Sequence, residues 1–117
     1  MKLTNAKILE SIQVLTGAKD EKGLLGYAVA VNLRKLTDEV QEYAKKRDEL
    51  IKEYGTDVGD GKYDFTAESG AALREAMRPY AEMEIDVAVM QIAPEVFYSG
   101  NLTSAQMYAL SWMVKEG

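Results

Sequence analysis

Residues 24–54 read LLGYAVAVNLRKLTDEVQEYAKKRDELIKEY and carry the strongest periodic pattern in the chain. Along this stretch, side chains follow one another at alternating intervals of four and three residues: Val29, Leu33, Leu36, Val40, Tyr43, Arg47, Leu50 and Tyr54. This heptad spacing, interrupted only by the charge of Arg47, predicts one long helix that pairs side by side with other helices. Such a helix would extend roughly 46 Å at about 1.5 Å per residue. We therefore expect either a second helix of the same chain or another subunit to lie along it.

The beginning of the long helix is open to a second interpretation. Residues 26–33 also alternate large and small side chains, which is compatible with a strand. We favour a helix because the spacing of three and four residues continues unbroken into the charged half. The nearly continuous apolar character of residues 24–31 then indicates burial on several sides. Gly55 follows Tyr54, as expected at the end of a helix.

Before the long helix, the sequence predicts a shorter one over residues 5–16. Thr4 is suited to the N-cap position, where its hydroxyl accepts a hydrogen bond from a free backbone N–H group. Leu3 and Ile8 occupy the two positions of a hydrophobic staple. Gly17 is a natural end for this helix.

After the long helix, residues 56–65 form a turn-rich segment in which Asp60 and Gly61 are suited to closing a short hairpin. A third helix is predicted to start near Thr66. Pro79 is expected to end or kink it, because proline lacks the N–H group and clashes with the preceding turn.

One clear strand and a last helix complete the predicted fold. Residues 84–92 carry β-branched side chains at alternate positions, which suits a strand. A lone strand needs a partner, and we consider residues 62–65 or the same strand of another subunit. Thr103 and Gln106 form a capping box for the last helix. The predicted fold class is α+β, mostly α, with four helices and one strand in a single domain over residues 1–117.

Composition excludes several classes of function. The chain has 14 basic and 19 acidic residues, a formal net charge of −5, no histidine and no cysteine. Disulfides, thiol nucleophiles, imidazole bases and the usual zinc sites are therefore absent, and a general nucleic-acid clamp is not expected. No leader and no apolar run of the roughly 20 residues that span a bilayer are evident. We expect a cytoplasmic protein without catalytic residues, metal, cofactor or membrane contact.

Phosphate recognition is the ligand chemistry that the sequence suits best. Arg74 and Arg78 lie one helical turn apart with an aromatic residue nearby, and a second basic cluster includes Arg47 at a seam position. There Arg47 would need an anion or a carboxylate as partner. The ligand-binding candidates are Lys45, Lys46, Arg47, Arg74, Arg78, Tyr80 and Trp112. The structural alternative pairs Arg47 with a glutamate across an interface and leaves the other charges as solvated surface.

Two other clusters have structural explanations as well. Trp112 and Tyr108 share one helix face and would suit base stacking, but core or interface packing is the favoured explanation. Asp57, Asp60 and Asp64 lie in a glycine-rich loop that suggests a hard cation. Their spacing departs from the calcium-loop pattern, so we interpret them as solvated turn residues.

The order of these segments resembles that of a group of small proteins encoded by phages and prophages of Gram-positive bacteria. The similarity is carried by residues 2–8, 47–55, 84–92 and 102–114. This chain departs from the group where Arg78 and Pro79 interrupt a helix that is acidic in similar proteins. The group has no agreed activity or catalytic residues, so the resemblance implies only a setting, that of a viral accessory protein inside a bacterium.

In that setting we expect a non-enzymatic, homo-oligomeric counter-defence factor that self-associates through the long helix. It would sequester a small immune nucleotide of the host or block a host immune protein by covering its surface. Arginine and lysine side chains would contact the phosphates, and an aromatic ring would stack on a base. The alternative is a virion assembly or structural accessory protein that acts through protein–protein contacts.

Overall fold

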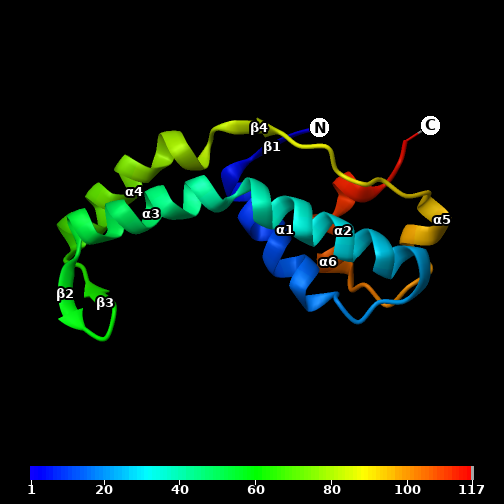
Figure 1. Ribbon diagram of the computed structural model, residues 1–117, viewed down its shortest axis with the longest axis horizontal. Helices are drawn as coiled ribbons and strands as arrows, with labels where there is room; N and C mark the ends of the chain where they lie inside the picture. Colours follow the sequence, from blue (N-terminus) through cyan, green and yellow to red (C-terminus); the bar gives the residue numbers. More distant parts are fainter. Residues whose placement is uncertain (117) are drawn as a thin grey trace.

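The computed structural model describes residues 1–116 as a mostly helical α+β chain of elongated shape, with principal extents of 49 × 27 × 23 Å (Figure 1). The elements follow one another as β1 (Lys2–Thr4), α1 (Asn5–Gly17), α2 (Gly23–Glu39), α3 (Gln41–Tyr54), β2 (Thr56–Gly59), β3 (Lys62–Asp64), α4 (Ala67–Ala81), β4 (Glu84–Asp86), α5 (Pro94–Phe97), α6 (Ser104–Ala109) and the 3₁₀ turn η1 (Ser111–Met113).

The helical course of residues 24–54 is confirmed, including the ambiguous part at 26–33, but the single long helix is wrong. Helices α2 and α3 meet at Val40, whose φ and ψ are −85° and −6°. The Val40 N–H still donates to the Leu36 carbonyl (3.0 Å), and its own carbonyl accepts from Ala44 (2.9 Å). The division follows the packing, because α2 lies against α1 whereas α3 lies against α4.

Most of the heptad seam is buried by other parts of the same chain. Its buried members are Val29, Leu36, Val40, Tyr43 and Leu50. The sequence leaves two ways to cover the seam, a helix of the same chain or another subunit. In the structure, two helices of the same chain cover it, α1 against α2 and α4 against α3. The expected coverage by another subunit therefore finds no support along the seam itself.

The predicted strand is shorter than expected and has a different partner. Strand β4 contains three residues and pairs antiparallel with β1, with Leu3 opposite Ile85. The two partners predicted for it, residues 62–65 and a second subunit, are wrong for this pairing. The ladder is short because β1 passes directly into α1, for which the Thr4 hydroxyl accepts from the Lys7 N–H (3.0 Å) as predicted.

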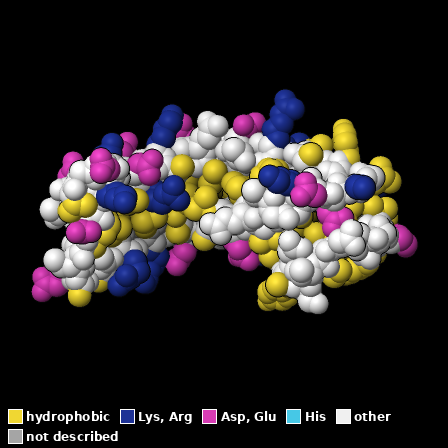
Figure 2. All heavy atoms as spheres, turned by 90° about the horizontal axis from the view of Figure 1, so that it is seen from below, with side chains coloured by type: hydrophobic (Ala, Val, Ile, Leu, Met, Phe, Trp, Pro, Cys, Tyr) yellow, Lys and Arg dark blue, Asp and Glu magenta, His cyan; other side chains and the backbone are white. Residues whose placement is uncertain are grey.

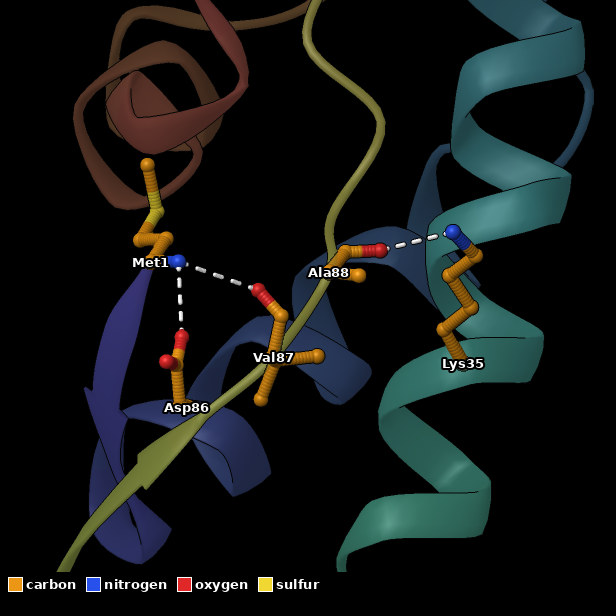
Figure 3. A network of polar contacts seen from close by, with 5 residues as sticks. All are labelled: Met1, Lys35, Asp86, Val87 and Ala88. Atoms are coloured by element: carbon orange, nitrogen blue, oxygen red, sulfur yellow. Dashed lines mark hydrogen bonds and ion pairs between the residues drawn. The ribbon is translucent and has the colours of Figure 1, made fainter.

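Residues 87–91, which we call the return segment, continue from β4 in an extended course without belonging to a strand. Side chains of α2 hold it instead of a neighbouring strand. Asn32 Nδ2 donates to the Met90 carbonyl (2.9 Å), and the Met90 N–H donates to Asn32 Oδ1 (2.7 Å). Lys35 Nζ donates to the Ala88 carbonyl (2.6 Å), as Figure 3 shows beside the contacts of Met1.

The predicted hairpin and α4 are confirmed in outline. Strands β2 and β3 pair antiparallel, and the turn between them has positive φ at Asp60 (54°) and Gly61 (72°). Thr66 and Ser69 form a reciprocal capping box at the start of α4. The helix continues two residues past Pro79, so proline does not end it there, although its last turn lacks the N–H group that would donate to the Glu75 carbonyl.

The C-terminal part differs from the single helix expected there. The capping box of Thr103 and Gln106 is confirmed, but α6 ends at Ala109 and continues as η1. The short helix α5, which starts at Pro94, is an addition to the predicted elements, as is β1. The main core lies among α1, α2 and these C-terminal elements, and its largest fully buried side chains are Phe97, Ile8, Leu15, Leu25, Leu36, Leu110 and Met113.

Candidate functional site

Residues 41–81, comprising α3, the β2–β3 hairpin and α4, form an arm that projects from the remaining body (Figure 1). Within the arm, α3 buries only Tyr43 and Leu50, and none of the fifteen residues of α4 is buried. The two helices pack against each other but leave their apolar side chains half covered. Viewed from below, hydrophobic surface runs along the arm between lysine, arginine and carboxylate side chains (Figure 2).

The end of the arm, which we call the tip (residues 56–65), carries two exposed large apolar side chains. Val58 is 53% exposed and Phe65 39% exposed. The Phe65 ring packs over Gly55, where a Cβ atom would lie 3.0 Å from its edge. A two-stranded hairpin has no opposite layer in which to bury such residues. The tip therefore exposes Val58 and Phe65 together with the carboxylates of Asp57, Asp60 and Asp64.

Most of the predicted phosphate-binding cations are paired with carboxylates of their own helix. The pairs are Lys45–Glu42 (3.3 Å), Lys46–Glu49 (3.6 Å), Arg47–Asp48 (3.9 Å) and Arg78–Glu75 (2.8 Å). These are partly exposed contacts between residues one to three positions apart, which contribute little to stability. Arg47 occupies a seam position but is partly exposed. The partner that the sequence analysis required for its charge is the carboxylate of the neighbouring Asp48.

The structure brings together one pair of the predicted residues from different helices. Lys46 Nζ of α3 lies 5.4 Å from the ring centroid of Tyr80 on α4, within the range of a cation–π contact. Both side chains line a recess of about 280 Å³ at the root of the arm, together with Tyr43 and Glu42. Asn5 closes this root, because its Nδ2 donates to the Tyr80 carbonyl (2.9 Å). Arg74 and Arg78 lie exposed on α4 and do not line the recess.

Trp112 does not join these residues. Its side chain is buried in the body, and its Nε1–H donates to the Ser11 hydroxyl (3.1 Å). The core interpretation is therefore the one that the structure has, and the predicted role of Trp112 as a stacking platform is corrected. Tyr108, its expected companion, is 83% exposed on α6.

The described part of the chain contains neither a cluster of metal-ligating side chains nor a bilayer-spanning helix. Within residues 1–116, no three acidic side chains converge to form a cation site, and the tip aspartates remain separate. Asp57 instead accepts a hydrogen bond from the Gly59 N–H (2.8 Å), a local turn contact. No helix in this part of the chain has the length and apolar character needed to cross a bilayer.

Comparison with protein-family models, curated proteins and solved structures finds no match to this chain. Sequence reasoning missed the exposed apolar side chains of the tip, Val58 and Phe65. Their position on either side of the Asp60–Gly61 turn was the available signal, because a short hairpin cannot bury side chains on both faces.

Proposed function

We propose that this chain is a non-enzymatic binding protein that acts by covering the surface of another protein with its arm. The observation that supports this proposal most directly is the lack of any buried residue on α4, although the helix carries a half-exposed apolar face. Projecting apolar surface rimmed by charges is typical of protein-interaction sites. A partner laid along α3 and α4 would complete a layer that the arm lacks.

The tip indicates the chemistry of the partner. The tip combines the exposed side chains of Val58 and Phe65 with three aspartates and one lysine, so it is both apolar and acidic. A complementary surface has an apolar pocket for the Phe65 ring and a basic rim. In the phage setting implied by the resemblance, such a surface belongs to a host immune effector or, in the alternative, to a virion component.

The nucleotide-sequestering version has weaker support. Lys45, Lys46 and Arg78 are already paired with carboxylates, and Trp112 is buried. The recess beside Tyr80 is the place where a small ligand would bind, since it has a cation and an aromatic ring together. Protein contact therefore fits the geometry better than phosphate capture does.

Site-specific crosslinking tests the proposal. A photo-reactive amino acid replaces Phe65 in one sample and Tyr108, a more exposed aromatic on the body, in a control. We expect the Phe65 sample alone to capture a defined protein from bacterial lysate. Binding of that purified protein should then weaken at least about 30-fold in Val58→Ser/Phe65→Ser and less than about twofold in Tyr108→Ser. Equal capture at both positions, or equal affinity of the variants, would contradict the proposal.

A thermal-shift panel separates the two versions. Cyclic and ADP-ribose-type nucleotides are added to the full chain, and a ligand that binds only the folded state raises its melting temperature. We expect no shift. A shift that disappears in Lys46→Ala and in Tyr80→Ala would instead favour nucleotide binding in the recess.

A further inference from the structure

The recess at the root of the arm is built by side chains from four helices. Asn5 is the first residue of α1, Glu39 is the last of α2, Glu42 and Lys46 belong to α3, and Tyr80 lies near the end of α4. The volume of about 280 Å³ lies just below the usual range of small-molecule sites, roughly 300–1,000 Å³. The recess therefore suits a ligand smaller than a nucleotide.

Asn5 offers this recess a hydrogen-bond acceptor. The residue is only 5% exposed, and its Nδ2 donates to the Tyr80 carbonyl (2.9 Å), which fixes the orientation of the amide. Its Oδ1 accepts no hydrogen bond from the described residues. Because no enclosed side-chain oxygen in that part of the chain lacks a partner, this oxygen is open to the recess that Asn5 lines. A nearly buried amide oxygen of this kind calls for a donor.

The recess has more acceptors than donors. The exposed carboxylates of Glu39 and Glu42 line it together with Asn5. Glu42 is paired with the exposed Lys45 (3.3 Å), and Glu39 forms no ion pair with the described residues. Three accepting groups therefore share the recess with one cation, Lys46, which favours a ligand that donates hydrogen bonds and carries positive charge.

The position of Lys46 shows that a cation fits beside the Tyr80 ring. Its Nζ lies 5.4 Å from the ring centroid, close to the limit of about 6 Å for a cation–π contact. The same Nζ lies 3.6 Å from a carboxylate oxygen of Glu49, which does not line the recess. Lys46 can therefore turn toward Glu49 and leave the ring to another cation.

We propose that the recess binds a small organic ammonium ion. Its charge lies near the Tyr80 ring, Asn5 Oδ1 and the carboxylates of Glu39 and Glu42, and its apolar body lies against the Tyr43 side chain. This ligand is opposite in charge to the phosphates expected from the sequence. The recess is at the root of the arm, away from the tip, so the inference does not rest on the proposed covering of another protein.

An amide-detected NMR titration of the full chain tests the ligand class. Phenethylamine, phenethyl alcohol and phenylpropanoate have similar apolar bodies but are cationic, neutral and anionic. We expect the amine to shift the amide signals of Tyr43 and Tyr80 with a Kd of about 1 mM or tighter, as small ligands of this size reach. The alcohol and the carboxylate should bind at least about tenfold more weakly, because they lack the charge-assisted hydrogen bonds.

Variants of exposed or half-exposed residues then test the site by the direction of their effects. Lys46→Gln should strengthen amine binding about threefold, since it removes a competing cation, whereas a nucleotide in the same recess would bind more weakly to this variant. Glu42→Gln should weaken amine binding about fivefold. Lys52→Gln, an exposed change on α3 outside the recess, should leave it unchanged.

The proposal would be overturned by equal affinity for the three probes, by amine-induced shifts that do not include Tyr43 and Tyr80, or by weaker amine binding in Lys46→Gln. The same holds if none of the probes shifts any signal at concentrations about tenfold above the expected Kd. None of these results would bear on capture of a protein partner at Phe65, so the two proposals fail separately.

Discussion

In the body, α2 lies against α1 and α5 and holds the return segment, whereas in the arm α3 packs mainly against α4. Helices α2 and α3 belong to one periodic stretch of sequence, but only α2, in the body, packs against several elements. Phe97, Ile8 and Met113 are completely buried there, while α4 buries nothing. The difference teaches that a heptad seam predicts which side of a helix is covered, but not how completely.

The two regions also differ in how they satisfy polar groups. The body buries Asn5, Ser11 and Asn32, each with a hydrogen-bond partner far away in sequence. No buried side-chain nitrogen or oxygen in the described chain lacks a partner. The arm's ion pairs, such as Arg78–Glu75, join near neighbours on one helix. Polar contacts between residues far apart in sequence therefore hold the body together, whereas the ion pairs of the arm are local contacts within one helix.

The largest contrast should appear when an apolar side chain is truncated in each region. Phe97→Ala removes a fully buried ring and should lower the free energy of unfolding by about 4 kcal/mol. Leu73→Ala on the half-exposed face of α4 should lower it by only about 1 kcal/mol. Urea denaturation followed by circular dichroism measures both. Equal losses would mean that the arm is as well packed as the body.

A smaller effect is expected from Asn32→Ala. The change removes two hydrogen bonds and leaves the buried N–H and carbonyl groups of Met90 without partners, which should cost about 2–3 kcal/mol. Hydrogen exchange at the Met90 amide should accelerate more than exchange in α3 does. Unchanged protection of Met90 would show that the return segment is held by something other than Asn32.

The smallest effect should come from Arg78→Ala on the arm. Its guanidinium makes an exposed contact with Glu75, so stability should change by no more than about 0.5 kcal/mol. The melting curve of this variant is compared with that of Arg74→Ala, its neighbour one turn away. A much larger loss specific to Arg78 would indicate that the arm depends on its charges more than its geometry suggests.

Local features of the fold were predictable from the sequence because nearby residues determine them. The Thr4 cap, the Thr103 capping box and the Asp60–Gly61 turn depend on side chains within a few positions of one another. Pairing over long distances was not predictable in the same way. Nothing near β4 indicates that its partner lies at Leu3, more than 80 residues earlier.

The same contrast between local and long-range features applies to the residues of the candidate site. The pairing of Arg47 with a carboxylate was one of two interpretations open at the sequence level, and the carboxylate turned out to be the adjacent Asp48. The contact between Lys46 and Tyr80 depends on how α4 folds back along α3, which no local pattern gives. Trp112 was a ligand-binding candidate for which packing was the favoured alternative, and its burial against Ser11 agrees with that alternative.

Asn5 connects the beginning of the chain to the root of the arm, since its backbone N–H donates to the Met83 carbonyl (3.2 Å) and its side chain to the Tyr80 carbonyl (2.9 Å). During synthesis on the ribosome, these acceptors emerge long after Asn5 does. The arm contains its own pairing partners and can close as it leaves the exit tunnel. Strand β1 can pair with β4 only after the arm has been translated, so it reaches its native partner late.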